Sequence, residues 1–163
     1  MRHSKSAYPL GVADHDRPLN ERGVRDAQAA SQWFGQQGFT LDEAWISSAL
    51  RAQQTWSGIE SGVRSASATP VLQRTVPSLY EASDTHLLSL LAGATVSRLL
   101  VVAHNPGLEN LVHSIVGLDP HGWLAHISVK FPTGAVCVLR HEGWQTLASG
   151  QAELLTYAVP RAS

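Results

Sequence analysis

An unbroken apolar run at residues 98–104, RLLVVAH, constrains the fold more than any other part of the chain. Runs of this kind are typical of strands whose two faces are both covered, as in a parallel sheet between helices. The segment NPGLENLVHSIVG (residues 105–117) follows at once, with apolar side chains at helical spacing. They are Leu108, Leu111, Val112 and Ile115. A buried strand that leads directly into an amphipathic helix predicts an α/β fold.

Strands and helices alternate through the rest of the chain as well. Apolar spacing predicts helices over residues 19–39, 51–62 and 83–94. Asn20 and Ser83 are the predicted N-caps of the first and third helix. In the first helix, the predicted core face consists of Val24, Ala27, Ala30 and Phe34. Gly38 is predicted to end this helix.

Further strands complete the predicted sheet. Residues 43–48 and 70–80 are extended, and residues 134–149 are predicted to form a hairpin that turns at Glu142-Gly143. Parallel strands joined by helices need helices on both faces. The predicted fold is therefore a three-layer α/β/α sandwich with a mainly parallel central sheet, and residues 1–163 form one domain.

The composition excludes several classes of partner. The formal net charge of −1 provides no overall basic field for nucleic acid or an anionic membrane. No apolar stretch approaches the ~20 residues that span a bilayer. Cys137 is the only cysteine, which excludes an intrachain disulfide and a cysteine-based zinc site. The N-terminus carries no apolar signal-peptide region, so we expect a cytoplasmic protein.

Polar residues gather at one predicted edge of the sheet, where ligands of α/β proteins bind beyond the carboxyl ends of the strands. Arg51 follows the first predicted strand, and His104 ends the apolar run. Arg2 and His3 would hold the same position if a strand preceded them. The neighbours of these residues at that edge are Ser47, Ser48, Asn105 and Pro106. The sequence therefore predicts that two arginines and two histidines meet there.

Five stretches of this chain resemble the histidine phosphatase superfamily, also called the phosphoglycerate mutase-like or RHG family. They are RHSKS (2–6), DRPLNERG (16–23), SSALRAQQT (47–55), LYEAS (79–83) and VVAHNPGLE (101–109). The stretches occur in the family's order, and each has its predicted structural context. The short branch of SixA-like phosphohistidine phosphatases is the most similar part of the family. The resemblance implies the phosphoglycerate mutase-like fold.

Two positions depart from the family pattern. Ser4 stands where the family usually has Gly or Ala, which are also small. Family members carry an apolar strand before the Arg-His pair, in the middle of the sheet, whereas only Met1 precedes Arg2 here. Either the start is misassigned or trimmed, or the chain lacks a central strand and leaves backbone hydrogen bonds unmade. We expect a misassigned or trimmed start.

The resemblance also implies roles for the four central residues. His3 would be the nucleophile and form a phosphohistidine intermediate, since a neutral imidazole is nucleophilic at cellular pH without a metal. Arg2 and Arg51 would hold the phosphoryl oxygens with their planar guanidinium groups. His104 would be the fourth phosphate ligand and donate a hydrogen bond.

Other candidates carry open alternatives. Glu81, in LYEAS, matches a position where short family members place a general acid, but an ordinary exposed loop glutamate explains it equally well. Arg17 either lines the entrance and binds a substrate anion or forms a salt bridge with Asp14 or Asp16. Ser48 and Asn105 are expected either to contact the residues that bind the phosphate or to bind the substrate themselves.

The resulting hypothesis is a phosphatase (a hydrolase of phosphate monoesters or phosphohistidine) that needs no cofactor and no metal. The loops are short throughout, so an open cleft is expected, which suits a phosphorylated protein but also admits small phosphorylated substrates. A catalytically silent phosphate-binding or phosphoprotein-binding module of the same fold is the alternative.

A histidine metalloenzyme is a third hypothesis, because the chain has 8 histidines. None of them lies in an HExxH or HxH pattern, and the spacing of His121 and His126 does not suit one helical face. A Gly-rich phosphate loop between a strand and a helix is also absent from the sequence, which disfavours nucleotide binding.

Overall fold

Three parallel strands form one half of the central sheet in the computed structural model, which describes residues 1–67 and 69–162. They are β1 (Glu43–Ile46), β2 (Leu72–Thr75) and β3 (Leu99–Val102), in the order β2-β1-β3. Parallel pairing places Ile46 beside both Thr75 and Val102. The carboxyl ends of the three strands therefore meet at one edge of the sheet, as predicted.

The second half of the sheet differs from the prediction. Its strands are β4 (Val116–Leu118), β5 (Val136–Arg140) and β6 (Ala152–Ala158), in the order β4-β6-β5. β5 pairs antiparallel with β6, so the predicted hairpin between residues 134–141 and 143–149 is wrong. Residues 144–146 form a turn, in which the N–H of Leu147 donates to the carbonyl of Trp144 over 3.3 Å, so this segment is not a strand and β6 pairs with β5 instead.

Residues 1–3 join the two halves of the sheet. Arg2 forms a parallel bridge with Ala103, just after β3, and its N–H donates to the carbonyl of Ala135, just before β5, over 2.9 Å. The N–H of His3 donates to Ala103 over 3.0 Å, and the N–H of Gly134 donates to the carbonyl of His3 over 3.0 Å. These residues therefore occupy the central position for which the sequence offered no strand, and they satisfy the backbone groups on either side.

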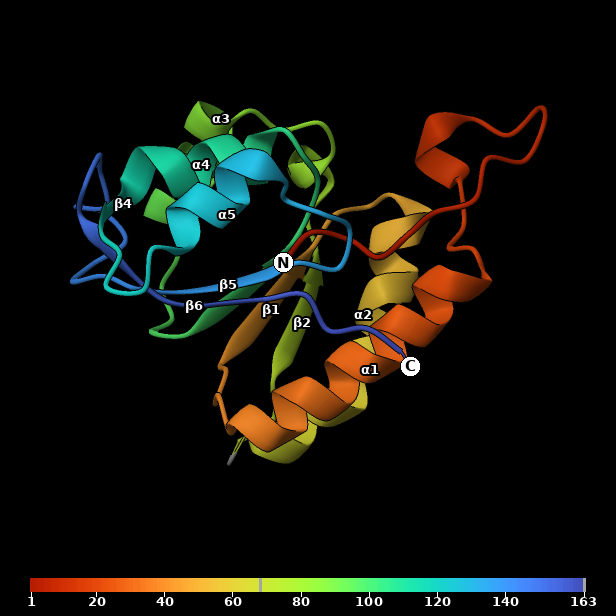
Figure 1. Cartoon of the computed structure of the whole chain (residues 1–163), viewed down its shortest axis with the longest axis horizontal. Helices are drawn as coiled ribbons and strands as arrows, with labels where there is room; N and C mark the ends of the chain where they lie inside the picture. Colours follow the sequence, from red (N-terminus) through yellow and green to blue (C-terminus); the bar gives the residue numbers. More distant parts are fainter. Residues whose placement is uncertain (68, 163) are drawn as a thin grey trace.

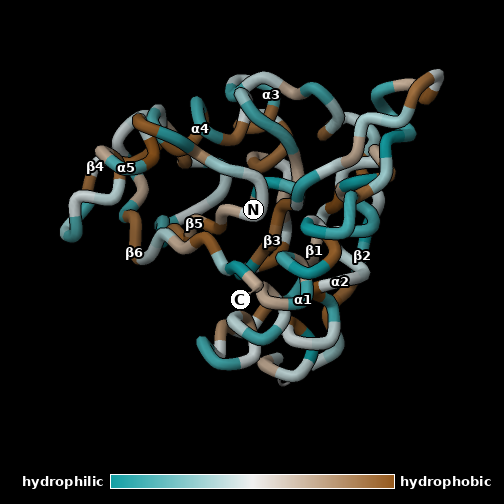
Figure 2. The backbone as a smooth tube through the Cα atoms, turned by 45° about the vertical axis from the view of Figure 1, so that its right-hand side comes forward, coloured by the Kyte–Doolittle hydropathy of each residue, from teal (hydrophilic) through white to brown (hydrophobic). Residues whose placement is uncertain are grey.

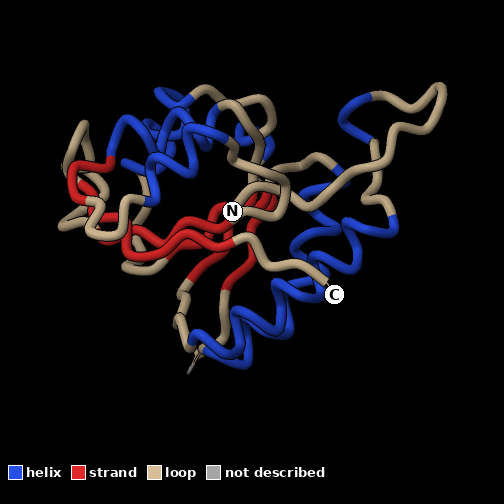
Figure 3. The backbone as a smooth tube through the Cα atoms, in the orientation of Figure 1, coloured by secondary structure: helices blue, strands red, loops and turns tan. Residues whose placement is uncertain are grey.

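Helices cover both faces of the sheet (Figures 1 and 3). One face carries α1 (Glu21–Gln37) and α2 (Leu50–Ala66), and the other carries α3 (Asp84–Ala92), α4 (Gly107–Ile115) and α5 (Trp123–Val129). Two short 3-10 helices are η1 (Asp14–Asp16) and η2 (Pro77–Leu79). Each layer has its own apolar cluster against the sheet, and Figure 2 shows hydrophobic residues along β3 and β6. The predicted three-layer α/β/α sandwich is confirmed.

None of the helices in residues 1–67 and 69–162 combines the length and the apolar character that crossing a membrane requires.

The first turn of α1 corrects one part of the predicted core face. Asn20 caps the helix by accepting a hydrogen bond from the N–H of Gly23, and Gly38 ends it with a left-handed φ of 69°, both as predicted. Val24, however, is 46% exposed. Gly23 packs directly on the carbonyl of Lys5, and this contact turns the next residue along the helix outward.

Close contact between α1 and α2 depends on a glycine. The N–H of Gly62 in α2 donates to the hydroxyl of Ser31 in α1 over 2.9 Å. A Cβ added at Gly62 would lie 1.8 Å from the carbonyl oxygen of Ser31, so the two helix backbones meet where no larger residue fits.

We therefore expect Gly62→Ala to lower the free energy of unfolding by about 1–3 kcal/mol, because the added methyl forces the helices apart. Gly35→Ala is the matched control, since its Cβ would meet nothing closer than the Ser65 hydroxyl at 3.5 Å. Alanine is also the better helix former by about 1 kcal/mol, so this variant should be as stable as the wild type or more so. Urea denaturation measures the free energy of unfolding of both variants. A Gly62→Ala protein of wild-type stability would contradict the close contact.

Candidate active site

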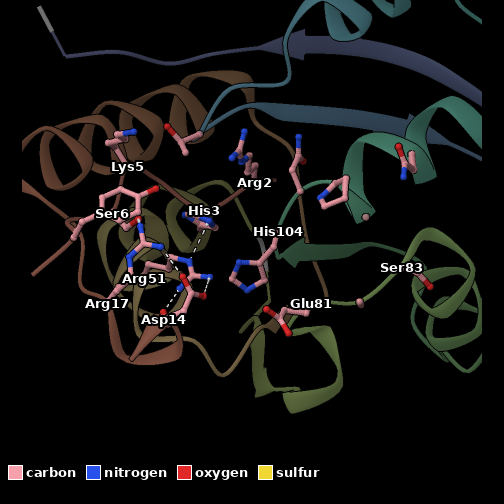
Figure 4. Close-up of a pocket in the computed structure, with 17 residues that line it drawn as sticks. Arg2, His3, Lys5, Ser6, Asp14, Arg17, Arg51, Glu81, Ser83 and His104 are labelled. Carbon is pink, nitrogen blue, oxygen red and sulfur yellow. Dashed lines mark hydrogen bonds and ion pairs between the residues drawn. The ribbon is translucent and has the colours of Figure 1, made fainter. Parts of the chain in front are cut away.

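A pocket of about 580 Å³ opens at the carboxyl edge of the sheet (Figure 4). Most residues that the sequence predicted for the site line it: Arg2, His3, Arg17, Arg51, Glu81, His104 and Asn105. Ser48 does not, and its hydroxyl lies 2.9 Å from Nε2 of His15 instead. Stretches that are far apart in the sequence therefore meet at one place, as predicted.

The loop that carries His3 is fixed on the two helices beneath it. The N–H of Ser4 donates to the Thr55 hydroxyl of α2 over 2.9 Å, and that hydroxyl donates to the carbonyl of Arg51 over 2.7 Å. The carbonyl of Lys5 accepts from the N–H of Asn20, the N-cap of α1, over 3.0 Å. Buried hydrogen bonds thus hold the loop in one conformation, and the same hydroxyl links it to the first turn of α2.

The hydrogen bonds of His3 determine which ring nitrogen carries the proton. Nδ1 lies 2.7 Å from the carbonyl oxygen of Ser4, which can only accept, so Nδ1 holds the hydrogen. Nε2 is then the basic nitrogen, and it accepts from Nε of Arg51 over 3.3 Å. His3 is only 7% exposed, and Figure 4 shows its ring among the charged side chains of the pocket. This arrangement presents a nucleophilic lone pair next to a guanidinium group.

Burial keeps both pocket histidines uncharged. The pKa of His3 is lowered to about 3, mainly by desolvation, which outweighs the hydrogen bond to Ser4, and the charges of Arg51 and Arg2 act in the same direction as desolvation. Desolvation also lowers the pKa of His104 to about 4, with Arg51 acting in the same direction. At neutral pH each ring is therefore a neutral imidazole.

His104 faces His3 across the floor of the pocket, with 5.0 Å between the ring centroids. Its Nε2 lies 2.7 Å from the hydroxyl of Ser47, which fixes the orientation of the ring. Ser47 is completely buried at the end of β1. The strand-end serine that the sequence placed at this edge is therefore a direct partner of His104, a role that the sequence did not assign.

Arg51 lines the pocket and is only 6% exposed. Besides its contact with His3, it donates through both terminal nitrogens to Asp14, reaching the backbone oxygen over 2.5 Å and Oδ2 over 2.9 Å. Arg17 donates to Oδ1 of the same carboxylate over 2.6 Å. The salt-bridge alternative for Arg17 therefore holds, with Asp14 as the partner, and Arg17 lines the pocket as well.

Sequence reasoning missed Asp14 and Tyr80 as parts of the site. The Tyr80 hydroxyl donates to Oδ2 of Asp14 over 2.9 Å, and its ring packs edge-on against His104. Desolvation raises the pKa of Asp14, but hydrogen bonds from Tyr80, Arg17 and Arg51 outweigh it and bring the pKa to about 2. The only feature of the sequence that pointed to Asp14 was its position three residues before Arg17, a spacing that allows an ion pair between them.

Arg2 and Asn105 share one backbone acceptor. The carbonyl of Phe131 accepts from Arg2 over 2.6 Å and from the amide of Asn105 over 3.3 Å. Asn105 also donates to Glu109 of α4 over 2.7 Å. The carbonyl of Phe131 thus holds both side chains at the edge of the pocket, and Figure 4 shows Arg2 on the opposite side from Asp14.

Glu81 lines the pocket from a constrained loop. Its φ of 53° lies in the left-handed region, which is uncommon for a residue other than glycine. The loop is held close to α4, because a Cβ at Gly107 would lie 2.0 Å from the carbonyl oxygen of Ala82. The glycine of the AHNPG stretch thus brings the Glu81 loop to the mouth of the pocket.

The lining of the pocket carries more cationic than anionic side chains. In residues 1–67 and 69–162, no three His, Cys, Asp or Glu side chains are placed to hold a metal ion together. Arginines and a lysine line the pocket instead: Arg2, Lys5, Arg17 and Arg51. Guanidinium groups suit the oxygens of a phosphoryl group.

Known proteins share both the sequence pattern and the fold. The family model of the histidine phosphatase superfamily (branch 1) matches residues 1–83. An uncharacterized protein of Mycobacterium tuberculosis is 39% identical over 99% of this chain and 100% of its own length. A protein of Nakamurella multipartitia assigned as the phosphohistidine phosphatase SixA has a structure with a TM-score of 0.83 and 29% identity, covering 99% of this chain and 94% of its own.

A second SixA structure, from Agrobacterium tumefaciens and with the same assignment, has a TM-score of 0.79 and 26% identity over 98% of this chain and 94% of its own. The family model covers half of the chain, including Arg2, His3 and Arg51, and the structural match extends over the remainder. The chain belongs to the histidine phosphatase superfamily.

Proposed function

We propose that this protein is a phosphatase that transfers a phosphoryl group to Nε2 of His3 and then to water. Membership of the histidine phosphatase superfamily supports phosphatase activity. The observation that carries the mechanism is the hydrogen bond from Nδ1 of His3 to Ser4, because it leaves Nε2 with a lone pair inside an arginine-lined pocket. A neutral imidazole held in this way needs no metal to act as a nucleophile.

In the first step, Nε2 of His3 attacks phosphorus, and the N–P bond forms as the bond to the leaving oxygen or nitrogen breaks. Arg2 and Arg51 stabilise the charge on the equatorial oxygens, which is the largest contribution that such a site can make. Glu81, at the mouth of the pocket, gives a proton to the leaving atom.

In the second step, water attacks the phosphohistidine and the N–P bond breaks. Glu81 takes the proton of the water and is ready for the next cycle, while inorganic phosphate leaves. His104, fixed by Ser47, remains next to the phosphoryl group in both steps and donates to one of its oxygens. Arg17 and Asn105 complete the binding site at its rim.

We propose a phosphorylated protein, with phosphohistidine as the reacting group, as the favoured substrate. The pocket is open to solvent, and its volume of about 580 Å³ is far larger than one phosphoryl group. The two SixA relatives with identities of 29% and 26% are assigned as phosphohistidine phosphatases. Small phosphomonoesters would also enter a pocket of this shape, so they serve as test substrates.

We expect His3→Ala to lower the turnover of p-nitrophenyl phosphate and of a phosphohistidine peptide by about a thousandfold or more, because the nucleophile is lost. His86→Ala is the control, since His86 is exposed on α3 and does not line the pocket. A wild-type protein that binds phosphate but turns over neither substrate would be a silent binding module, and the enzyme proposal would be wrong.

Glu81→Gln separates two kinds of leaving group. Phenoxide is a poor leaving group, so we expect the single-turnover transfer of the phosphoryl group from phenyl phosphate to His3 to slow by about a hundredfold, as for the loss of a general acid. The P–N bond of phosphohistidine is labile and needs less help, so the same transfer from the peptide should slow by less than about fivefold. The measurement is confined to this first step because hydrolysis of phosphorylated His3, in which Glu81 acts as base, is common to both substrates. Equal losses in the transfer step would show that Glu81 does not act as the acid.

We expect the imidazoles of His3 and His104 to stay neutral from pH 8 down to pH 5, because desolvation lowers their pKa values to about 3 and about 4. Proton NMR of the Cε1–H resonances measures this directly, with His3→Gln and His104→Gln variants for assignment. Midpoints above about pH 5.5 for both rings would contradict the effect of burial on these pKa values.

A further inference from the structure

The two arginines on one side of the pocket already hold an anion that belongs to the chain. Oδ1 of Asp14 accepts from Arg17 over 2.6 Å, and Oδ2 accepts from Arg51 over 2.9 Å. The hydroxyl of Tyr80 donates to Oδ2 as well, over 2.9 Å. One carboxylate thus joins two guanidinium groups and a phenol, which are the kinds of donor that a phosphoryl group needs.

None of the three nitrogens of Arg51 is without an acceptor in this arrangement. Nε donates to His3, and the two terminal nitrogens donate to the backbone and the side chain of Asp14. Arg17 is engaged in the same way, with Ala7 and Ser6 accepting from its other nitrogens. Each terminal nitrogen carries a second hydrogen, so a phosphoryl group can share the arginines with Asp14, but it can take the N–H groups that point at Oδ1 and Oδ2 only from that carboxylate.

Asp14 carries its full charge at neutral pH, since the pKa of its carboxyl is held at about 2. A phosphoryl group bound to Nε2 of His3 would lie next to Nε of Arg51, the side chain whose terminal nitrogen also holds this carboxylate. The phosphoryl group and the carboxylate of Asp14 are both anions, so they repel each other at this distance as well as competing for the guanidinium group. Competition for donors and repulsion both oppose the binding of phosphate.

The segment that carries Asp14 can move without disturbing the core. Asp14 lies in η1, which has no buried residue. The chain before it projects from the body of the molecule, as the loop at the upper right of Figure 1 shows, and Leu10, in a turn of this segment, is fully exposed. The side chain of Asp14 is itself 48% exposed, so water can replace its arginine partners.

We propose that Asp14 is an internal competitor of the substrate phosphate: its carboxylate occupies Arg17 and Arg51 between turnovers, yields them to the phosphoryl group, and takes them back as inorganic phosphate leaves. The competition keeps the arginines in place in the empty site and weakens product inhibition. It rests on the proposed function, because it requires that phosphate bind at Arg51.

The opposite role for Asp14 makes the opposite prediction. If Asp14 served only to position Arg51 for the substrate, its removal would loosen the guanidinium group and weaken phosphate binding. A competitor, when removed, strengthens phosphate binding. The sign of the change in phosphate affinity therefore separates the two roles.

The experiment measures the dissociation constant of inorganic phosphate by calorimetry, and its inhibition constant against p-nitrophenyl phosphate, for the wild type, Asp14→Asn and Asp14→Ala. We expect both constants to fall about 5- to 20-fold in each variant, the size expected for a charged hydrogen-bonded competitor that water partly replaces. Asp16→Asn is the control, since Asp16 lies in the same 3-10 helix but pairs only with His15. Its constants should stay within about twofold of the wild type.

Unchanged or weaker phosphate binding by both Asp14 variants, with normal binding by the wild type, would overturn the competitor role and leave the proposed function standing. Equal tightening in Asp16→Asn would also overturn it, because a general change of charge would then be the cause. If the wild type and all variants fail to bind phosphate, both the competitor role and the proposed function are wrong. Using two substitutions at position 14 separates loss of the carboxylate from a local folding defect.

Discussion

The hydrogen bonds that hold residues 1–3 in the middle of the sheet are the constraint on which the site depends. Ala103 on one side and the segment at Gly134 and Ala135 on the other satisfy the backbone of these residues. This pairing makes the sheet continuous and also places His3 at its carboxyl edge, beside His104. The same few bonds therefore determine both the connection of the two halves and the position of the proposed nucleophile.

The electrostatics of the pocket follow from which groups are buried there. The cationic side chains are Arg2, Lys5, Arg17 and Arg51, and the carboxylates are Asp14 and Glu81. Both imidazoles are neutral, because desolvation lowers their pKa values. The pocket thus has more positive than negative groups, although the chain as a whole has a net charge of −1. A local excess of this kind attracts a phosphoryl dianion without making the whole surface basic.

Residues directly after strands could be predicted from the sequence, because the carboxyl ends of parallel strands share one edge. Arg51 and His104 were found in this way. The partnership of β5 with β6 could not be predicted, because residues 143–149 also resemble a strand, although residues 144–146 form a turn in the structure. The role of Asp14 was also hidden, because its three donors come from separate parts of the chain, and only the folded structure brings Arg17, Arg51 and Tyr80 together.

Arg51 connects the proposed nucleophile with the proposed competitor. Its Nε covers the lone pair of His3, and its terminal nitrogens hold Asp14, so one side chain is engaged with both. A guanidinium group is planar, and moving it toward a phosphoryl group changes all of these contacts together. The proposed nucleophile, the guanidinium group that would stabilise the developing charge and the carboxylate that opposes phosphate are thus joined through one side chain, and a substitution at Arg51 would disturb all three.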